Sequence, residues 1–242
     1  MTCNRLWLGT AGWSVPASCR DRIGGTGSHL ERYSGALCAV EIDSSFYRPH
    51  RRATYERWAG VTPRDFRFSV KVPKALTHAT DFDRSTVDRF FEEVAGLGSK
   101  LAVLLVQLPP SKAFDADWAA RLFEALRSRT SVPIVCEPRH QSWFRDETEQ
   151  WLADHIIARV AADPPRAKGA DRPGGWQGLR YFRLHGSPRI YYSSYSKEAL
   201  AEISKRLSFA LVSSDAWCIF DNTATGAAME NALLLTAGSF EG

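Results

Sequence analysis

The sequence predicts a single α/β domain, a (β/α)8 barrel of the TIM type with a parallel, eight-stranded core. Short apolar runs alternate with helical patterns from end to end, as is typical of a parallel sheet. The chain has 242 residues, close to the roughly 250 residues of one such barrel. Residues 101–107 are almost entirely apolar, as expected for a strand covered on both faces. An open, doubly wound sheet is the alternative topology.

The expected strands and helices alternate along the chain, except that a loop joins the sixth and seventh strands. The strands are 6–10, 39–43, 66–72, 101–107, 134–137, 156–161, 180–185 and 217–220. The helices between and after them are 29–37, 53–59, 85–97, 115–127, 146–154, 196–207 and 227–237. Ser85 and Asp115 are suitable N-cap residues, and Gly98 is a typical helix stop.

The domain prediction covers residues 1–242 as one unit, with no second domain. Residues 164–178 are rich in Pro, Gly, Lys and Arg. A segment of this length without periodicity is uncommon inside a compact domain. We therefore expect it to be a mobile or disordered loop.

Composition and charge limit the classes of protein. Hydrophobic content of 44% and charged content of 24% are those of an ordinary globular protein. The net charge of +4 fits an anionic small molecule, and no Lys/Arg block demands nucleic acid. The five cysteines show no CxxC spacing, which indicates reduced thiols in a cytoplasmic protein. The N-terminus lacks a signal-peptide pattern and no run is long enough to span a membrane, so neither secretion nor membrane insertion is expected.

Polar residues gather where the expected strands end, and residues 133–143 give the strongest signal. There an apolar strand passes abruptly into Glu137, Arg139 and His140. In a parallel barrel the loops after the strands build the site. The candidate binding residues at these positions are Trp13, Tyr47, Lys71, His78, Gln107, Arg139, His140, Trp143, Asp163, Arg183 and Asn222.

The first functional hypothesis is an enzyme that acts on a small anionic substrate, phosphorylated or carboxylated. Lys71, Arg139 and Arg183 would bind the anion, since guanidinium and ammonium groups suit phosphate and carboxylate. Glu137 or Glu41 would act as the acid/base, with His185 as its partner. Hydrolase-type and isomerase-type reactions both stay open.

Three alternatives accompany this hypothesis. A divalent metal has donors in Glu41, Asp43, His78, Glu137, Asp163 and His185, although no HxH or HExxH spacing supports it. Single-stranded nucleic acid could stack on the loop aromatics beside basic groups. The charges could also pair with one another in a purely structural network. No bound nucleotide cofactor is expected, because a P-loop and a GxGxxG pattern are absent.

The strand-end motifs resemble those of the YecE-like family, domain of unknown function 72. They are residues 9–13, 40–47, 68–71 with 77–78, 107–110, 137–143, 183–186, and 221–222 with 226–231. The resemblance covers nearly the whole chain and implies a TIM-type barrel, but it implies no activity. Two departures concern the first loops: Ser14-Val15-Pro16 replaces the usual pattern after Trp13, and Asp43 stands where Asn is common.

Overall fold

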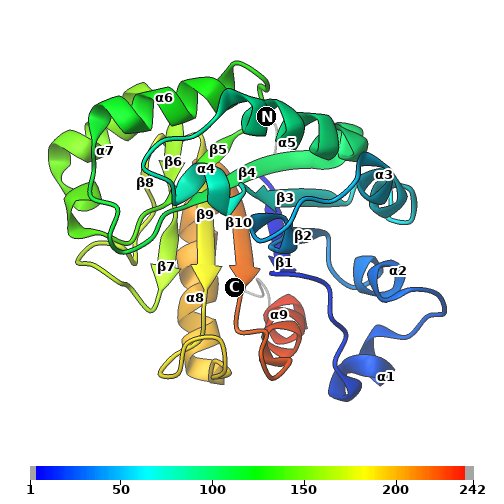
Figure 1. The fold of residues 1–242 in the computed structure, drawn as a ribbon. Helices are drawn as coiled ribbons and strands as arrows, with labels where there is room; N and C mark the ends of the chain where they lie inside the picture. Colours follow the sequence, from blue (N-terminus) through cyan, green and yellow to red (C-terminus); the bar gives the residue numbers. More distant parts are fainter. Residues whose placement is uncertain (1–3, 238–242) are drawn as a thin grey trace.

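The strands form two hydrogen-bonded sheets in the computed structural model, which describes residues 4–237 (Figure 1). The four-stranded sheet is parallel, with the order β1 (Leu6–Thr10), β10 (Asp215–Phe220), β9 (Leu179–Leu184), β7 (Ala161–Asp163). The six-stranded sheet has the order β2 (Ala39–Ile42), β3 (Arg67–Lys71), β4 (Leu101–Gln107), β5 (Ile134–Glu137), β6 (Ile157–Arg159), β8 (Gly174–Gly175). Only β8 runs antiparallel to its neighbour.

The expected single barrel with one parallel eight-stranded core is therefore wrong. Residues 156–161 were expected to form one strand, but the chain divides at Val160. Before it, β6 pairs with β5, and after it, β7 pairs with β9 in the other sheet. At the opposite junction β1 and β2 share a single bridge between Ala11 and Glu41, supported by the Gly12 amide, which donates to the Glu41 carbonyl at 2.8 Å. β8 makes the six-stranded sheet mixed rather than parallel.

Helices cover the outer faces of both sheets. They are α1 (Arg20–Ile23), α2 (His29–Ser34), α3 (Arg52–Gly60), α4 (Lys74–Thr77), α5 (Arg84–Val94), α6 (Ala116–Arg127), α7 (Asp146–Asp154), α8 (Lys197–Leu211) and α9 (Ala227–Ala237). Four short 3-10 helices are η1 (Ala17–Cys19), η2 (Ser44–Phe46), η3 (Ala95–Lys100) and η4 (Gln141–Phe144). In Figure 1, α3, α5, α6 and α7 form an arc along the top, whereas α8 and α9 lie below. Asp115 caps α6 as expected, but Asp83 rather than Ser85 caps α5.

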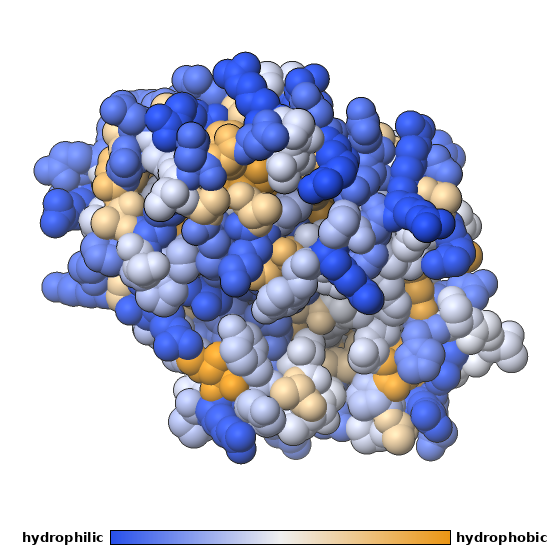
Figure 2. All heavy atoms as spheres, in the orientation of Figure 1, coloured by the Kyte–Doolittle hydropathy of each residue, from blue (hydrophilic) through white to orange (hydrophobic). Residues whose placement is uncertain are grey.

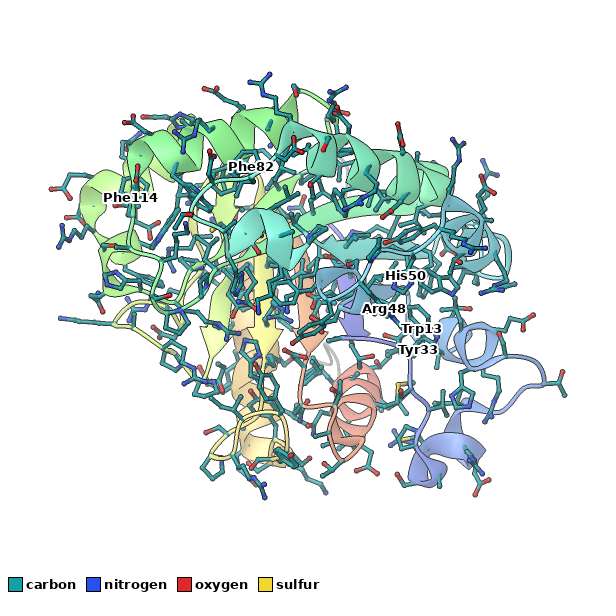
Figure 3. The ribbon with its side chains drawn as sticks, viewed as in Figure 1. Trp13, Tyr33, Arg48, His50, Phe82 and Phe114 are labelled. Carbon is teal, nitrogen blue, oxygen red and sulfur yellow. The ribbon has the colours of Figure 1, made fainter. Side chains whose placement is uncertain are left out.

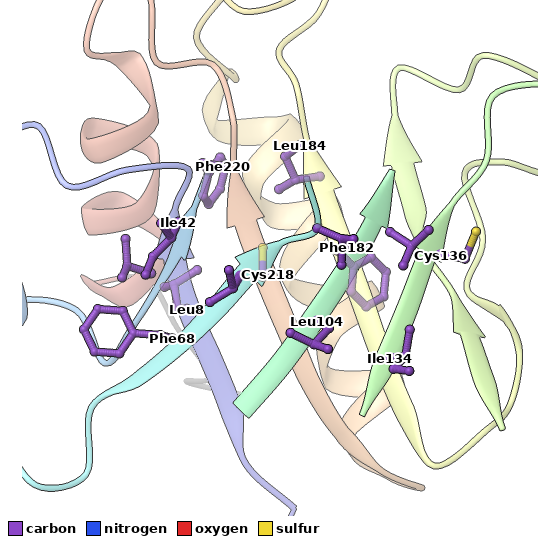
Figure 4. Close-up of a cluster of buried hydrophobic side chains, with 14 of the residues drawn as sticks. Leu8, Ile42, Phe68, Leu104, Ile134, Cys136, Phe182, Leu184, Cys218 and Phe220 are labelled. Atoms are coloured by element: carbon purple, nitrogen blue, oxygen red, sulfur yellow. The ribbon is translucent and has the colours of Figure 1, made fainter. Parts of the chain in front are cut away.

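The apolar core has two layers, because side chains alternate across each strand. One layer lies between the sheets and the helices and includes Phe68, Phe182 and Phe220 (Figure 4). The other is a separate cluster on the inward faces of the strands, with Tyr181 and Trp217 stacked in parallel. The face of the molecule seen in Figure 2 is mostly hydrophilic, with small apolar patches. Every second residue of a strand continues to face inward beyond this second layer, and the last of these residues lie at the carboxyl ends of the strands.

Residues 164–178 make several specific contacts. The Arg159 guanidinium donates to the carbonyls of Gly169 at 3.2 Å and Arg172 at 3.0 Å. The Gly175 amide donates to Glu149 at 2.7 Å, where β8 pairs with β6. A sequence of two glycines gives no strand pattern, so β8 was not expected. The mobility of this segment stays a prediction.

Four of the five cysteines lie in the described part of the chain. Cys19, Cys38, Cys136 and Cys218 are free, and Cys3 lies outside the described residues. Within residues 4–237, no helix combines the length and the apolar character needed to cross a membrane.

Gly9 is required where β1 passes close to β2. A Cβ atom there would lie 2.2 Å from the Ala39 carbonyl oxygen, which already accepts a hydrogen bond from the Tyr33 hydroxyl at 2.9 Å. We expect Gly9→Ala to lower the free energy of unfolding, measured with urea, by roughly 1–3 kcal/mol, because overpacking forces the backbone to shift. Gly60→Ala is the control, since a Cβ there meets nothing within 4 Å. Equal stability of the two variants would contradict this packing.

Candidate functional site

The inward alternation of the strands brings six polar side chains together at the carboxyl ends of both sheets. Each stands two residues beyond an inward-facing residue of its strand. The six are Glu41, Lys71, Gln107, Glu137, Arg183 and Asp221, all less than a tenth exposed. Arg139 lies two positions after Glu137, and His185 lies two positions after Arg183. These two side chains therefore form a second tier above the first.

Arg183 is at the centre of this group and is completely buried. Its Nε and Nη2 atoms donate to the two carboxylate oxygens of Glu41 at 3.1 and 2.7 Å. Nη2 also donates to Asp221 Oδ2 at 3.0 Å, and Nη1 donates to Glu137 Oε2. Arg183 and Asp221 lie at the end of the four-stranded sheet, whereas the two glutamates belong to the six-stranded sheet. The Arg183 guanidinium therefore links the two sheets.

His185 lies between two carboxylates. Its Nδ1 is 2.9 Å from Asp221 Oδ2, and its Nε2 is 3.1 Å from Glu137 Oε1. Burial opposes the charged form, but Glu137 and Asp221 outweigh it and raise the pKa of His185. Both ring nitrogens thus face carboxylate oxygens, an arrangement that favours the charged imidazolium form.

The buried carboxylates differ in their electrostatic environment. Burial tends to raise the pKa of Glu137, yet the cations Arg183, His185 and Arg139 hold that pKa well below its usual range. The pKa of Asp221 is lowered for the same reason, against the effect of burial. For Glu41, by contrast, burial dominates and raises the pKa in spite of Arg183.

Two further cations, Lys71 of the first tier and Arg139 of the second, lie at the edge of this network. The Arg139 guanidinium donates through Nε and Nη2 to Glu137 Oε1 at 3.2 and 3.1 Å. The Lys71 ammonium donates to Asp43 Oδ1 at 2.7 Å and lies 4.3 Å from the centre of the Phe46 ring. Each cation has a single carboxylate partner, so it retains donors for a ligand.

A cavity of about 420 Å³ opens above this network. It is lined by Asp43, Phe46, Tyr47, Lys71, Lys74, His78, Gln107, Arg139, Tyr191, Asp221 and Thr223. Burial and the neighbouring Lys74 and Lys71 lower the pKa of His78 to about 4, so this imidazole is neutral near pH 7. The described hydrogen bonds of the Asp221 carboxylate all use Oδ2, which leaves Oδ1 for a ligand.

Two tryptophans predicted for substrate binding lie away from the cavity lining. Trp143 is fully buried, and its indole N–H donates to the Lys112 carbonyl at 2.9 Å. Trp13 packs edge-to-face on Trp58, with ring centres 4.8 Å apart, and lies near His50 in Figure 3. Both tryptophans serve packing between loops and helices.

Three polar candidates are also used elsewhere. His140 caps the 3-10 helix η4 with its side chain. Asp163 accepts a hydrogen bond from the Tyr195 hydroxyl at 2.9 Å. Asn222 is completely buried and donates to the Ser193 carbonyl at 2.9 Å. These residues hold the loops that surround the site.

Sequence reasoning left several participants out of the candidate site. Asp221 could have been found, because it continues the inward alternation after Ile219. Tyr181 donates to Glu41 Oε2 at 2.9 Å, but an aromatic residue inside a strand gives no signal beyond core packing. Lys74 and Tyr191 line the cavity from loop and helix positions that no strand pattern indicates.

The carboxylates and imidazoles considered for a metal face other partners. Glu41, Glu137 and His185 are directed at Arg183 or at one another. Within the described range 4–237, no group of three or more His, Cys, Asp or Glu side chains is arranged to hold a metal ion. A divalent metal stays an untested prediction.

The raised pKa of His185 leads to a prediction about stability and pH. The pKa of His185 in the folded protein lies above its unfolded value of about 6.5. The charged ring therefore stabilises the fold fully below about pH 6.5, and this stabilisation is lost as the pH rises through the folded-state pKa. We expect the free energy of unfolding to fall over this range in the wild type and to fall less in His185→Gln. Urea titrations between about pH 6 and 9 measure this. The exposed His29→Gln variant should keep the wild-type slope, and an identical slope in all three proteins would contradict the charged His185.

Comparison with known proteins identifies the family. Residues 7–238 match the family described as "Protein of unknown function DUF72", so the chain belongs to this family and the resemblance seen in the motifs is confirmed. The UPF0759 protein YunF of Bacillus subtilis (strain 168) is 26% identical over 178 residues, 68% of this chain and 63% of YunF. The UPF0759 protein YecE of Escherichia coli (strain K12) is 26% identical over 153 residues, 61% of this chain and 53% of YecE. The matched region thus spans between about half and two thirds of these relatives.

Solved structures of the family share the fold. A DUF72 family protein from Enterococcus faecalis V583 superimposes with a TM-score of 0.81 at 22% identity, over 96% of this chain and 94% of that one. A DUF72 family protein from Thermotoga maritima MSB8 gives a TM-score of 0.77 at 23% identity, over 97% and 98% of the two chains. At this level of identity the similarity establishes the fold and leaves the activity open.

Proposed function

We propose that the 420 Å³ cavity binds a small substrate with a phosphate or carboxylate group and that the protein catalyses proton transfer on it. The observation that carries the proposal is the position of three cations, Lys71, Lys74 and Arg139, on the wall of one cavity above a fixed ionic network. Oriented cations next to buried charges are a common basis of anion recognition.

The charge balance supports an anionic ligand. When His185 is protonated, the cavity and the network below it contain five positive and four negative groups and therefore have one positive charge in excess. They are Lys71, Lys74, Arg139, Arg183 and His185 against Glu41, Asp43, Glu137 and Asp221. Protonation of Glu41, whose pKa is raised, would increase the surplus.

The proton-transfer role fits Asp221 and His78. Asp221 Oδ2 is held by Arg183 and His185, so its Oδ1 has a fixed direction at the cavity and can accept a proton or a hydrogen bond from the substrate. His78 supplies a neutral imidazole on the same wall, which can polarise a carbonyl or relay a proton. The two groups support the proton transfers that isomerase-type and hydrolase-type reactions share.

Glu41 and Glu137 take a different role from the acid/base function first expected of them. Both oxygens of each carboxylate are engaged by cations. We assign to both glutamates the task of fixing Arg183, and through Glu137 also Arg139. Binding of single-stranded nucleic acid stays an alternative prediction, but a cavity of this volume favours a small ligand.

The proposal is tested with a matched pair of probes, glycerol 3-phosphate and glycerol. Calorimetric titration should detect saturable binding of the phosphate compound and none of glycerol at the same concentration. Proton transfer is tested by NMR, as deuterium uptake from D2O into a mixture of small phosphorylated and carboxylated compounds. Asp221→Asn should lose the uptake but keep anion binding. Equal behaviour of glycerol and glycerol 3-phosphate would overturn the anion site.

A further inference from the structure

A second, larger cavity lies on the opposite face of β9. Its volume is about 690 Å³. Along β9, Tyr181 and Arg183 face inward, whereas Arg180 and Phe182 line this outer cavity. The cavity is therefore distinct from the anion site at the carboxyl ends of the strands.

The path of the chain explains why this cavity exists. The connection from β7 to β9 contains β8 but no helix, so the outer face of β9 is not covered by a helix on that side. Residues 171–173 with Gln177 form one wall, and the second half of α8 forms the other. The gap between these walls is the cavity.

Two guanidinium groups in this cavity have no carboxylate partner among the described residues. The other charged groups on its wall pair locally: Arg172 with Asp171 at 3.9 Å and Lys205 with Glu202 at 3.7 Å. Arg180 and Arg206 are the two that remain.

Arg180 in particular has an unmet hydrogen-bonding requirement. Its Nη1 atom is buried and has no hydrogen-bond partner within the described chain. A buried charged donor without an acceptor is costly, by more than the roughly 1–3 kcal/mol of a neutral group. Arg206 donates one hydrogen bond to the Asp171 carbonyl, and its remaining donors are available to a second acceptor. An anionic group between the two guanidiniums would satisfy both.

Beside the charged and polar groups, part of the cavity wall is apolar. Phe182 forms part of it, with the Arg206 guanidinium carbon 5.6 Å from its ring centre. Pro173, Ala210 and Phe209 extend this surface, and Phe209 is 82% exposed. Together these residues form a continuous apolar part of the wall on which a hydrocarbon group could pack.

We infer that this cavity is a second ligand site, for an amphipathic organic anion. Its acidic group lies between Arg180 and Arg206, and its apolar body packs on Phe182 and Phe209. Charge and apolar contact act together, because guanidinium groups bind carboxylate or phosphate oxygens and aromatic faces bury the hydrocarbon part. This inference does not depend on the function proposed for the first cavity.

The probes for this site are 4-phenylbutyrate and its neutral analogue 4-phenylbutanol, titrated by calorimetry into the whole protein. We expect the carboxylate to bind at this site also in Arg139→Met, in which the first cavity has lost an anion-binding group, and we expect affinity for the alcohol at least about tenfold lower, the effect of about 1.4 kcal/mol. Arg180→Met and Arg206→Met should each weaken carboxylate binding by a similar factor. Ser213→Trp, which fills the rim of the cavity without removing a cation, should block both probes.

Controls separate this site from the first one and from general effects. Arg20→Met removes an exposed arginine on α1, and Arg139→Met alters the first cavity; both should leave 4-phenylbutyrate affinity unchanged. Circular dichroism verifies that each variant is folded. Absence of binding by the wild type, or undiminished binding by both Arg180→Met and Arg206→Met, would overturn the inference.

Discussion

Replacement of Arg183 by methionine is expected to destabilise the protein more than any other single change to the ionic network. The variant leaves Glu41, Glu137 and Asp221 buried without their shared cation. Removing one partner of a buried ion pair typically costs about 3–5 kcal/mol. For a domain of this size that corresponds to a fall in melting temperature of about 6–20 °C, measured by calorimetry or circular dichroism.

The matched control is Arg52→Met. Arg52 pairs with Glu56 at 2.9 Å on the surface of α3, with both side chains more than half exposed, so its loss should change stability by no more than about 0.5 kcal/mol. A second variant tests the electrostatic cause: Arg183→Met with Glu41→Gln should recover part of the loss, because it removes the carboxylate whose cationic partner among the described residues is Arg183. If Arg183→Met melts like the wild type, the network is not what joins the two sheets.

Replacement of Arg139 by methionine is expected to have the opposite profile: a large effect on binding and a small one on stability. Arg139 lines the cavity, but its carboxylate partner Glu137 also has Arg183 and His185 as partners. In Arg139→Met, the negative charge of Glu137 is therefore still compensated by two cations. Affinity for glycerol 3-phosphate should fall about tenfold or more, since a hydrogen bond to a charged group contributes about 1.5–3 kcal/mol. Calorimetric titration of both proteins measures this change.

The control for charge is Arg121→Met on α6, where the arginine is 57% exposed and only 3.9 Å from Asp81. It removes the same charge from the molecule but should leave the affinity unchanged. If Arg121→Met and Arg139→Met weaken binding equally, the effect is one of net charge and not of the cavity. Strong thermal destabilisation by Arg139→Met would indicate that this arginine is mainly structural.

The central part of the site could be predicted from the sequence because it follows the alternation of the strands. Glu41, Glu137 and Arg183 each end an apolar run on its inward side, and parallel strands present their carboxyl ends at one edge. The same rule, applied to Ile219, would also have found Asp221. Strand periodicity therefore carries most of the information about this network.

What the sequence could not supply depends on local geometry. Nothing in the run 156–161 indicates that pairing changes sheet at Val160, since small or β-branched apolar residues stand on both sides of it. Trp143 lies in the 3-10 helix η4, and Asp163 ends the three-residue strand β7, so neither has a strand pattern long enough to orient its side chain. Their side chains turn to the Lys112 carbonyl and to Tyr195, contacts that only the three-dimensional arrangement determines.

The most direct test of the anion site is the position of a bound oxyanion in crystals grown with tungstate, whose tungsten atom is located by anomalous scattering. We predict a tungsten peak in the cavity lined by Lys71, Lys74 and Arg139, with its oxygens at hydrogen-bonding distance from these groups, about 2.7–3.2 Å. Crystals of Arg139→Met should lack this peak. Tungstate bound elsewhere on the wild-type protein, with this cavity empty, would contradict the proposed site.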